Sequence, residues 1–164
     1  MRVFISSTYR QLASYREILR LAIEKSGHTF LGMEHFAAQD APPLDVCLQE
    51  LETADVYVGV IGTNYGSSPP GSDSSYTELE YHHALELGIP CILLVISEDA
   101  LIPVGGIDLD PTRNGRLRDF LTLVMNSHTI DRFSSEHEAA WKVLAAIRVE
   151  EARRLEVGNI GAIQ

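Results

Sequence analysis

The chain has 164 residues, of which 45% are apolar and 22% charged, a composition typical of one globular domain with a single core. Its formal net charge of −10 argues against binding to the phosphate backbone of a nucleic acid, although a locally cationic loop can still bind a mononucleotide. No apolar run approaches the roughly 20 residues of a membrane helix, and no secretion signal is recognisable. Cys47 and Cys91 stand alone in apolar sequence, so we expect reduced cysteines in a cytoplasmic protein.

Strands and helices are predicted to alternate from the N-terminus onward. An apolar strand over residues 2–6 is followed by a helix over residues 11–26, because Leu12, Leu19 and Ile23 recur at helical spacing. Next come a short strand over residues 28–33 and a helix from Leu44 to Leu51. Together these segments make the first two strand–helix units.

The second half of the chain continues the alternation. Its strands cover residues 55–62, 91–97 and 129–133, and the first two are apolar throughout. Its helices begin near Thr77, near Arg116 and at Glu136, and the last is expected to end near Leu155.

Continuous apolar strands separated by helices predict an α/β fold with a parallel sheet covered on both faces. We expect a flavodoxin-like sheet of five strands in the order 2-1-3-4-5, within one domain over residues 1–155. Residues 156–164 are expected to form a tail or linker to further domains. In this order the ligand site lies beyond the carboxyl ends of the first and third strands, where the strand order reverses.

Five polar residues leave the first strand at that point: Ser6, Ser7, Thr8, Tyr9 and Arg10. One interpretation is structural, with Ser7 or Thr8 capping the helix and Arg10 paired to a surface carboxylate. The other is a cradle for an anion or a ribose, in which hydroxyls, helix N–H groups and a guanidinium face one ligand.

The long loop after the third strand is the second candidate element. Loops of this length inside a compact domain are usually functional or mobile. We expect residues 63–76 to face the Ser6–Arg10 segment across one pocket. The ligand-binding candidates here are Gly62, Tyr65, Gly66, Ser75 and Tyr76, and the alternative is a flexible surface loop.

Three carboxylates lie near the predicted pocket. Ser75 and Glu78 have capping-box spacing, which gives Glu78 a structural role. Glu80 falls in the apolar arc of its helix, where a carboxylate is costly unless it is used; the alternative is a second capping box with Thr77. Glu34 ends the second strand and lies either at the pocket rim or in solvent.

Several catalytic signatures are missing from the sequence. It contains no GxxxxGK[ST], no GxGxxG after the first strand and no GxSxG. His82 and His83 are adjacent, so they diverge on a helix and cannot share a metal ion. We therefore expect no metal site and no required cofactor.

Four stretches resemble a bacterial family of TIR-like domains without assigned function. These are "VFISSTYRQLASYRE", "GMEHF", "CLQELETADVYVGVIGTNYGS" and "SYTELEYHHALELGIPCILLV", which together cover about residues 2–97. The wider superfamily includes TIR domains and nucleoside 2-deoxyribosyltransferases. Its catalytic glutamate lies on the helix after the third strand, and the family spacing to Ala84 and to Gly88-Ile89-Pro90 selects Glu80. The tryptophan common before the TIR glutamate is replaced by nearby Tyr76.

The resemblance implies three functions. The first is a TIR-like effector that binds a nucleotide such as NAD and hydrolyses its nicotinamide–ribose bond in bacterial anti-phage defence, with NAD as substrate rather than cofactor. The second is a non-catalytic module that self-associates with other TIR-like domains. The third is a deoxyribosyltransferase acting on nucleosides. None of the three requires a nucleic acid or a membrane as partner.

Overall fold

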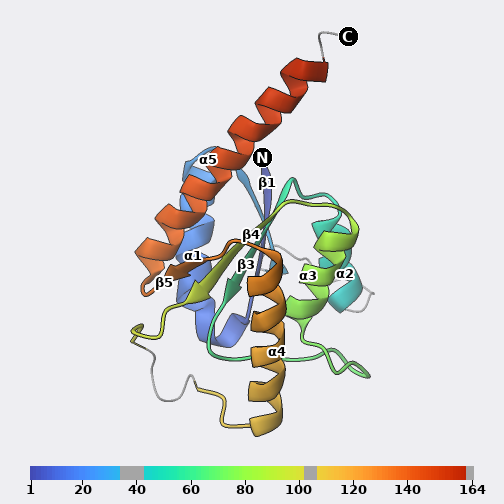
Figure 1. The fold of residues 1–164 in the computed structure, drawn as a ribbon, viewed down its shortest axis with the longest axis vertical. Helices are drawn as coiled ribbons and strands as arrows, with labels where there is room; N and C mark the ends of the chain where they lie inside the picture. Colours follow the sequence, from blue (N-terminus) through green and yellow to red (C-terminus); the bar gives the residue numbers. More distant parts are fainter. Residues whose placement is uncertain (34–42, 102–106, 162–164) are drawn as a thin grey trace.

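The fold is known from a computed structural model, which describes residues 1–33, 43–101 and 107–161; the side chains of residues 9, 10 and 157–161 lie outside the description. Five parallel strands form one sheet in the order β2-β1-β3-β4-β5, which confirms the predicted flavodoxin-like topology (Figure 1). The strands are β1 (Arg2–Ser7), β2 (Thr29–Leu31), β3 (Val56–Ile61), β4 (Cys91–Ile96) and β5 (Asp131–Phe133). The helices are α1 (Tyr9–Lys25), α2 (Pro43–Leu51), α3 (Tyr76–Glu86), α4 (Pro111–Ser127) and α5 (Glu136–Gly161).

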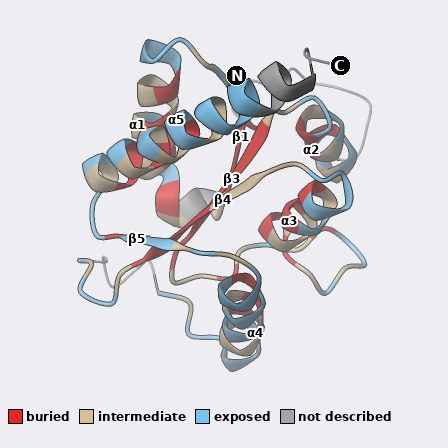
Figure 2. Cartoon of the chain, turned by 45° about the horizontal axis from the view of Figure 1, so that its top comes forward, coloured by how far each residue is buried: buried red, intermediate tan, exposed pale blue. Residues whose placement is uncertain are grey.

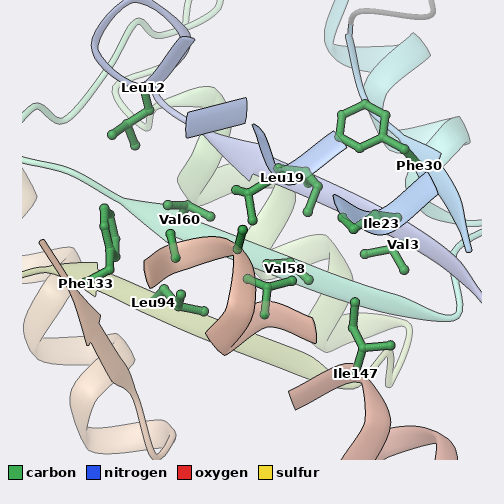
Figure 3. Packing of buried hydrophobic residues seen from close by; sticks show 14 of the residues in the cluster. Val3, Leu12, Leu19, Ile23, Phe30, Val58, Val60, Leu94, Phe133 and Ile147 are labelled. Atoms are coloured by element: carbon green, nitrogen blue, oxygen red, sulfur yellow. The ribbon is translucent and has the colours of Figure 1, made fainter. Parts of the chain in front are cut away.

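Alternate residues of the central strands face two separate cores. Val58 of β3 packs with Leu19 of α1 and Ile147 of α5, whereas its neighbour Tyr57 packs with Tyr81 of α3 on the opposite face. Figure 3 shows the first core closely, with side chains from the strands meeting those of α1 and α5. Helices α1 and α5 therefore cover one face of the sheet, and α2, α3 and α4 cover the other.

Burial follows the same layers. The middle strands are buried, while the outward faces of the helices are exposed (Figure 2). Every residue of β3 is buried, which explains why this strand reads as an unbroken apolar run. Within the described residues, no helix combines the length and the apolar character needed to cross a membrane.

Two helix boundaries lie five or more residues away from the sequence prediction. Helix α4 begins at Pro111 rather than near Arg116, because the Asp110 side chain caps it by accepting hydrogen bonds from the N–H groups of Thr112 (2.8 Å) and Arg113 (3.4 Å). The helix then continues through Gly115, a residue that costs about 1 kcal/mol relative to alanine inside a helix. The Gly/Pro/Asp-rich composition of this segment is typical of a loop, so the sequence prediction placed the helix start too late.

The final helix also extends beyond its expected end. Helix α5 continues to Gly161, so residues 156–161 are helical where we expected a tail or linker. Its later turns are tied to the sheet, since Arg154 forms an ion pair with Asp55, the residue before β3 (Nη1–Oδ1, 3.1 Å). Glu150 supports Arg154 from the same helix (3.2 Å). This long-range pairing has no local sequence signal.

Candidate functional site

A cavity of about 740 Å³ opens beyond the carboxyl ends of β1 and β3. This is the point where the strand order reverses, and ligands of open parallel sheets bind there. Its walls come from the β1–α1 turn, the loop after β3, the first turn of α3 and the segment that enters α4. The described residues that line it are Ser7, Thr8, Gln11, Met33, Pro43, Asn64, Gly66, Ser67, Tyr76, Thr77, Ile107, Asp108 and Arg113.

The three hydroxyl groups at the end of β1 each form a hydrogen bond to a different element of the fold. Ser6 donates a hydrogen bond to the Glu80 carboxylate on α3. Ser7 accepts one from the Arg16 guanidinium (3.0 Å), and Thr8 donates one to the backbone carbonyl of Asn64 (3.1 Å). Thr8 occupies the N-cap position of α1, one of the two placements expected, but its side chain makes no capping bond.

Gln11 is a cavity residue that the sequence analysis missed. Its side-chain oxygen accepts hydrogen bonds from the backbone N–H groups of Thr63 (3.0 Å) and Asn64 (3.2 Å), and its amide nitrogen donates to the Thr63 hydroxyl. The backbone of Leu12 departs from helical values (φ −109°, ψ 21°), which sets the first turn of α1 apart from the rest of the helix. Gln11 thereby fixes the beginning of the loop after β3.

Glu80 lies in a buried polar cluster rather than on the cavity wall. Its exposed fraction is 4% and that of its partner Ser6 is 1%. Burial and, after it, the adjacent Glu80 carboxylate together raise the pKa of the Cys47 thiol to about 12. Burial also raises the pKa of Tyr57, with the same carboxylate as the next contribution. Glu80 is therefore bordered by Ser6, Cys47 and Tyr57, and it follows the cavity residue Thr77 by about one helical turn.

Glu78 has the structural role that its spacing predicts. Ser75 is the N-cap residue of α3 and accepts a hydrogen bond from the Glu78 N–H (3.3 Å). Tyr65 completes the arrangement, because its hydroxyl donates to the Glu78 carboxylate and accepts from the Ser75 N–H (3.2 Å). The alternative capping box starting at Thr77 is wrong, since that residue lies inside the helix.

Four of the residues proposed for ligand binding line the cavity: Ser7, Thr8, Gly66 and Tyr76. Gly66 has a left-handed backbone (φ +91°), and a Cβ there would lie 3.1 Å from the Thr8 hydroxyl, so this position favours glycine. The loop thus approaches the β1–α1 turn closely.

Four others are not among the lining residues. Ser6, Tyr65 and Ser75 are buried, with their hydroxyls hydrogen-bonded inside the protein, so the structure does not bring these three residues to the cavity wall. Gly62 leaves room for Gln11, because a Cβ at this glycine would collide with that side chain. The side chains of Tyr9 and Arg10, and the whole of Glu34, lie outside the described residues.

A charged pair at the entrance of α4 is the second feature that the sequence analysis missed. The Arg113 guanidinium contacts the Asp108 carboxylate (Nη1–Oδ2, 3.3 Å), and both residues line the cavity. The Asp108 N–H donates to the side-chain oxygen of Asn64 (2.8 Å), which links this segment to the loop after β3. Across the described residues, we find no group of three or more His, Cys, Asp or Glu side chains suited to a metal ion.

Residues 2–148 match the family model described as "Domain of unknown function (DUF4062)". Two curated relatives, telomerase protein component 1 of Rattus norvegicus and of Mus musculus, are each 30% identical over 87 residues. These matches cover 44% of this chain and 3% of each relative, so the chain spans a small part of their length.

Solved structures share the fold at low sequence identity. The TIR domains of the activated Roq1 resistosome, which recognises the pathogen effector XopQ, match with a TM-score of 0.63 and 15% identity, over 89% of this chain and 98% of theirs. The CMP N-glycosidase BcmB of Clostridium botulinum matches with a TM-score of 0.51 and 18% identity, over 89% and 99%. A probable GTP-binding protein, engB, matches with a TM-score of 0.53 and 14% identity, over 94% and 99%.

Proposed function

We propose that this chain, which belongs to the DUF4062 family, is a TIR-like domain that binds a nucleotide in the cavity beside β1 and β3 and hydrolyses the nicotinamide–ribose bond of NAD when it is clustered. The observation that carries the proposal is the position of Glu80. A carboxylate that is 4% exposed is held by the Ser6 hydroxyl at the switch point of the sheet, and the nearby chain residues Ser7 and Thr77 line a cavity large enough for a nucleotide.

The proposed reaction needs only one carboxylate. The nicotinamide ring of NAD carries a positive charge and departs as a neutral molecule, so the leaving group requires no proton. The C1′–N bond breaks through an oxocarbenium-like transition state, and water then adds to C1′ and releases a proton. A carboxylate beside the ribose stabilises the developing positive charge, and it does so most effectively in a site that excludes water. Glu80 is the residue that we assign to this role.

The enclosure of Glu80 implies that the site must open before it can react. The carboxylate is not among the described residues that line the cavity, whose wall includes Thr77 of α3 and Ser7, the residue after Ser6. We infer that the arrangement seen here is a resting one, and that clustering of several domains shifts this wall. The isolated domain is then nearly inactive, as expected for an effector that responds to assembly in bacterial anti-phage defence.

A structural neighbour supports chemistry at an N-glycosidic bond. BcmB is by its name a CMP N-glycosidase, an enzyme that separates a base from a nucleotide. The match to the TIR domains of a resistosome that recognises a pathogen effector has the higher TM-score and favours a signalling context. The name of BcmB fits a nucleotide as the ligand of the cavity.

The second candidate function is a non-catalytic assembly module. Helix α5 exposes three large apolar side chains, Trp141 (59% exposed), Val149 (70%) and Leu155 (70%), which association with another copy would cover. A module of this kind binds other copies and leaves NAD intact.

Nicotinamide release from NAD distinguishes the two candidates. The full chain is attached to beads at high density and, separately, kept dilute in solution, and each sample is incubated with NAD. We expect release by the clustered sample and little by the dilute one. No release from either sample favours the assembly module. Exchange of a free base into a deoxynucleoside, without NAD cleavage, would instead favour the deoxyribosyltransferase.

A further inference from the structure

Arg113 is the one cation among the described residues that line the cavity. It lies in the first turn of α4, where the partial positive charge of the helix N-terminus adds to that of the guanidinium. Its side chain is 48% exposed, so a ligand in the cavity can reach it. In a chain of net charge −10, an anionic ligand needs such a local cation.

The guanidinium is held in place by its neighbour. Asp108 contacts one terminal nitrogen of Arg113 (3.3 Å) and is itself fixed, because its other carboxylate oxygen accepts the Asp110 N–H (3.0 Å). Its backbone carbonyl also accepts a hydrogen bond from the Asn114 side chain (3.0 Å). A guanidinium has five N–H donors in a fork that matches phosphate oxygens, so one contact to Asp108 leaves the others available.

Other residues of the cavity lining suit a sugar. Ser7, Thr8 and Ser67 present hydroxyl groups, and Asn64 presents its amide. These neutral groups can bond ribose hydroxyls but give little discrimination by charge. Arg113 is thus the described cavity residue best suited to distinguish a phosphorylated ligand from an unphosphorylated one.

We propose that Arg113 binds the 5′-phosphate of the ribose held in the cavity, so that the site takes phosphorylated nucleotides and discriminates against the corresponding nucleosides. The inference rests on the proposed function in assuming that the cavity is the nucleotide site. It adds a specificity residue on α4, far in the sequence from the Ser6–Arg10 segment.

Two probes that differ only in the phosphate test the proposal: nicotinamide mononucleotide and nicotinamide riboside. Binding of each to the full chain is measured by calorimetry at fixed salt. We expect the mononucleotide to bind about ten- to a hundredfold more tightly, as fits hydrogen bonds to a charged group. In Arg113→Gln this ratio falls close to one through weaker binding of the mononucleotide. Arg118→Gln removes an exposed cation of the same helix that does not line the cavity, and it retains the wild-type ratio.

The proposal is overturned if both probes bind equally to the wild type, if neither binds, or if Arg113→Gln keeps the wild-type ratio. Its failure can be told from failure of the proposed function. Preference for the mononucleotide that depends on Arg113, without any NAD cleavage by clustered protein, supports this inference and refutes the catalytic proposal. NAD cleavage by clustered protein, with an affinity ratio of the two probes that does not depend on Arg113, supports the catalytic proposal and refutes this inference.

Discussion

The hydroxyl of Ser6 at the end of β1 donates a hydrogen bond to the carboxylate of Glu80 on α3, a residue 74 positions away in the sequence. Both residues are almost fully buried. A buried carboxylate is costly unless hydrogen bonds stabilise it, so this contact helps to hold the carboxyl end of β1 and helix α3 together. The same contact fixes where Glu80 lies relative to the cavity.

Ser6→Ala should destabilise the fold. Removal of the hydroxyl leaves the buried carboxylate with one hydrogen bond fewer, at a cost of about 1–3 kcal/mol in the free energy of unfolding. Urea denaturation measures this change. Ser14→Ala is the matched control, because Ser14 also bonds a glutamate (Glu136, 2.9 Å) but at the exposed surface, and it should cost under about 1 kcal/mol. Equal losses of unfolding free energy in the two variants would show that the buried hydrogen bond stabilises the fold no more than the exposed one.

A pair of glycine variants tests the close approach of the loop to the β1–α1 turn. Gly66→Ala and Gly71→Ala share the strain of a left-handed backbone (φ +91° and +80°), about 1–2 kcal/mol each. Only at Gly66 does the new Cβ meet a neighbour, the Thr8 hydroxyl at 3.1 Å, whereas none lies within 4 Å at Gly71. Thermal denaturation should therefore show the larger loss for Gly66→Ala. A larger loss for Gly71→Ala would mean that the loop does not pack as described.

Tyr65→Phe tests the structural role assigned to this tyrosine. The variant keeps the buried ring and removes the hydroxyl that joins the Ser75 N–H to the Glu78 carboxylate. We expect a loss of about 1–2 kcal/mol in unfolding free energy with no change in ligand affinity. Tyr76→Phe should instead lower ligand affinity and leave the free energy of unfolding unchanged, since Tyr76 lines the cavity. Loss of affinity in Tyr65→Phe at unchanged stability would return this residue to the ligand site.

Alkaline pH should weaken the fold. Burial raises the pKa of Cys47 to about 12 and that of Cys91 to about 11, so both thiols hold their protons more tightly in the folded state than in the unfolded one. Their contribution to stability is complete below the unfolded cysteine pKa of about 8.5 and declines as the pH rises toward 12. The free energy of unfolding, measured by urea titration over this range, should fall. Cys91→Ser should show a shallower fall, whereas stability that rises with pH would contradict the assignment.

The sequence predicted the sheet well because its signals are local. The apolar runs of β3 and β4 reflect strands buried on both faces, and the strand–helix alternation leaves few topologies. The start of α4 was missed because Gly115 and its neighbours read as a loop, although Asp110 and Pro111 are a usable start signal.

The candidate site was predictable only in part. Glu80 stands out in the sequence because a carboxylate in the apolar arc of a helix is costly to bury without a hydrogen-bond partner. In the structure that partner is the Ser6 hydroxyl. The side-chain oxygens of Gln11 and Asn64 accept hydrogen bonds from distant backbone N–H groups, for which a single sequence has no periodic signal. Asp108 and Arg113 enter the cavity only because β4 and α4 bring them beside the loop after β3.

The central claim is that Glu80 stabilises positive charge on the ribose, and Glu80→Gln tests it most directly. The variant keeps the size and an acceptor for the Ser6 hydroxyl but removes the charge. The control is Glu78→Gln, whose carboxylate serves the start of α3 and which should cost at most about 1 kcal/mol of stability.

The decisive measurement is the rate of nicotinamide release from NAD by clustered wild type, Glu80→Gln and Glu78→Gln, with circular dichroism to confirm that each variant is folded. Several kcal/mol of transition-state stabilisation correspond to a loss of about a hundredfold or more for Glu80→Gln. Glu78→Gln should retain most of the wild-type rate. Equal rates for folded Glu80→Gln and wild type would contradict the catalytic assignment and leave the assembly module as the function of this domain.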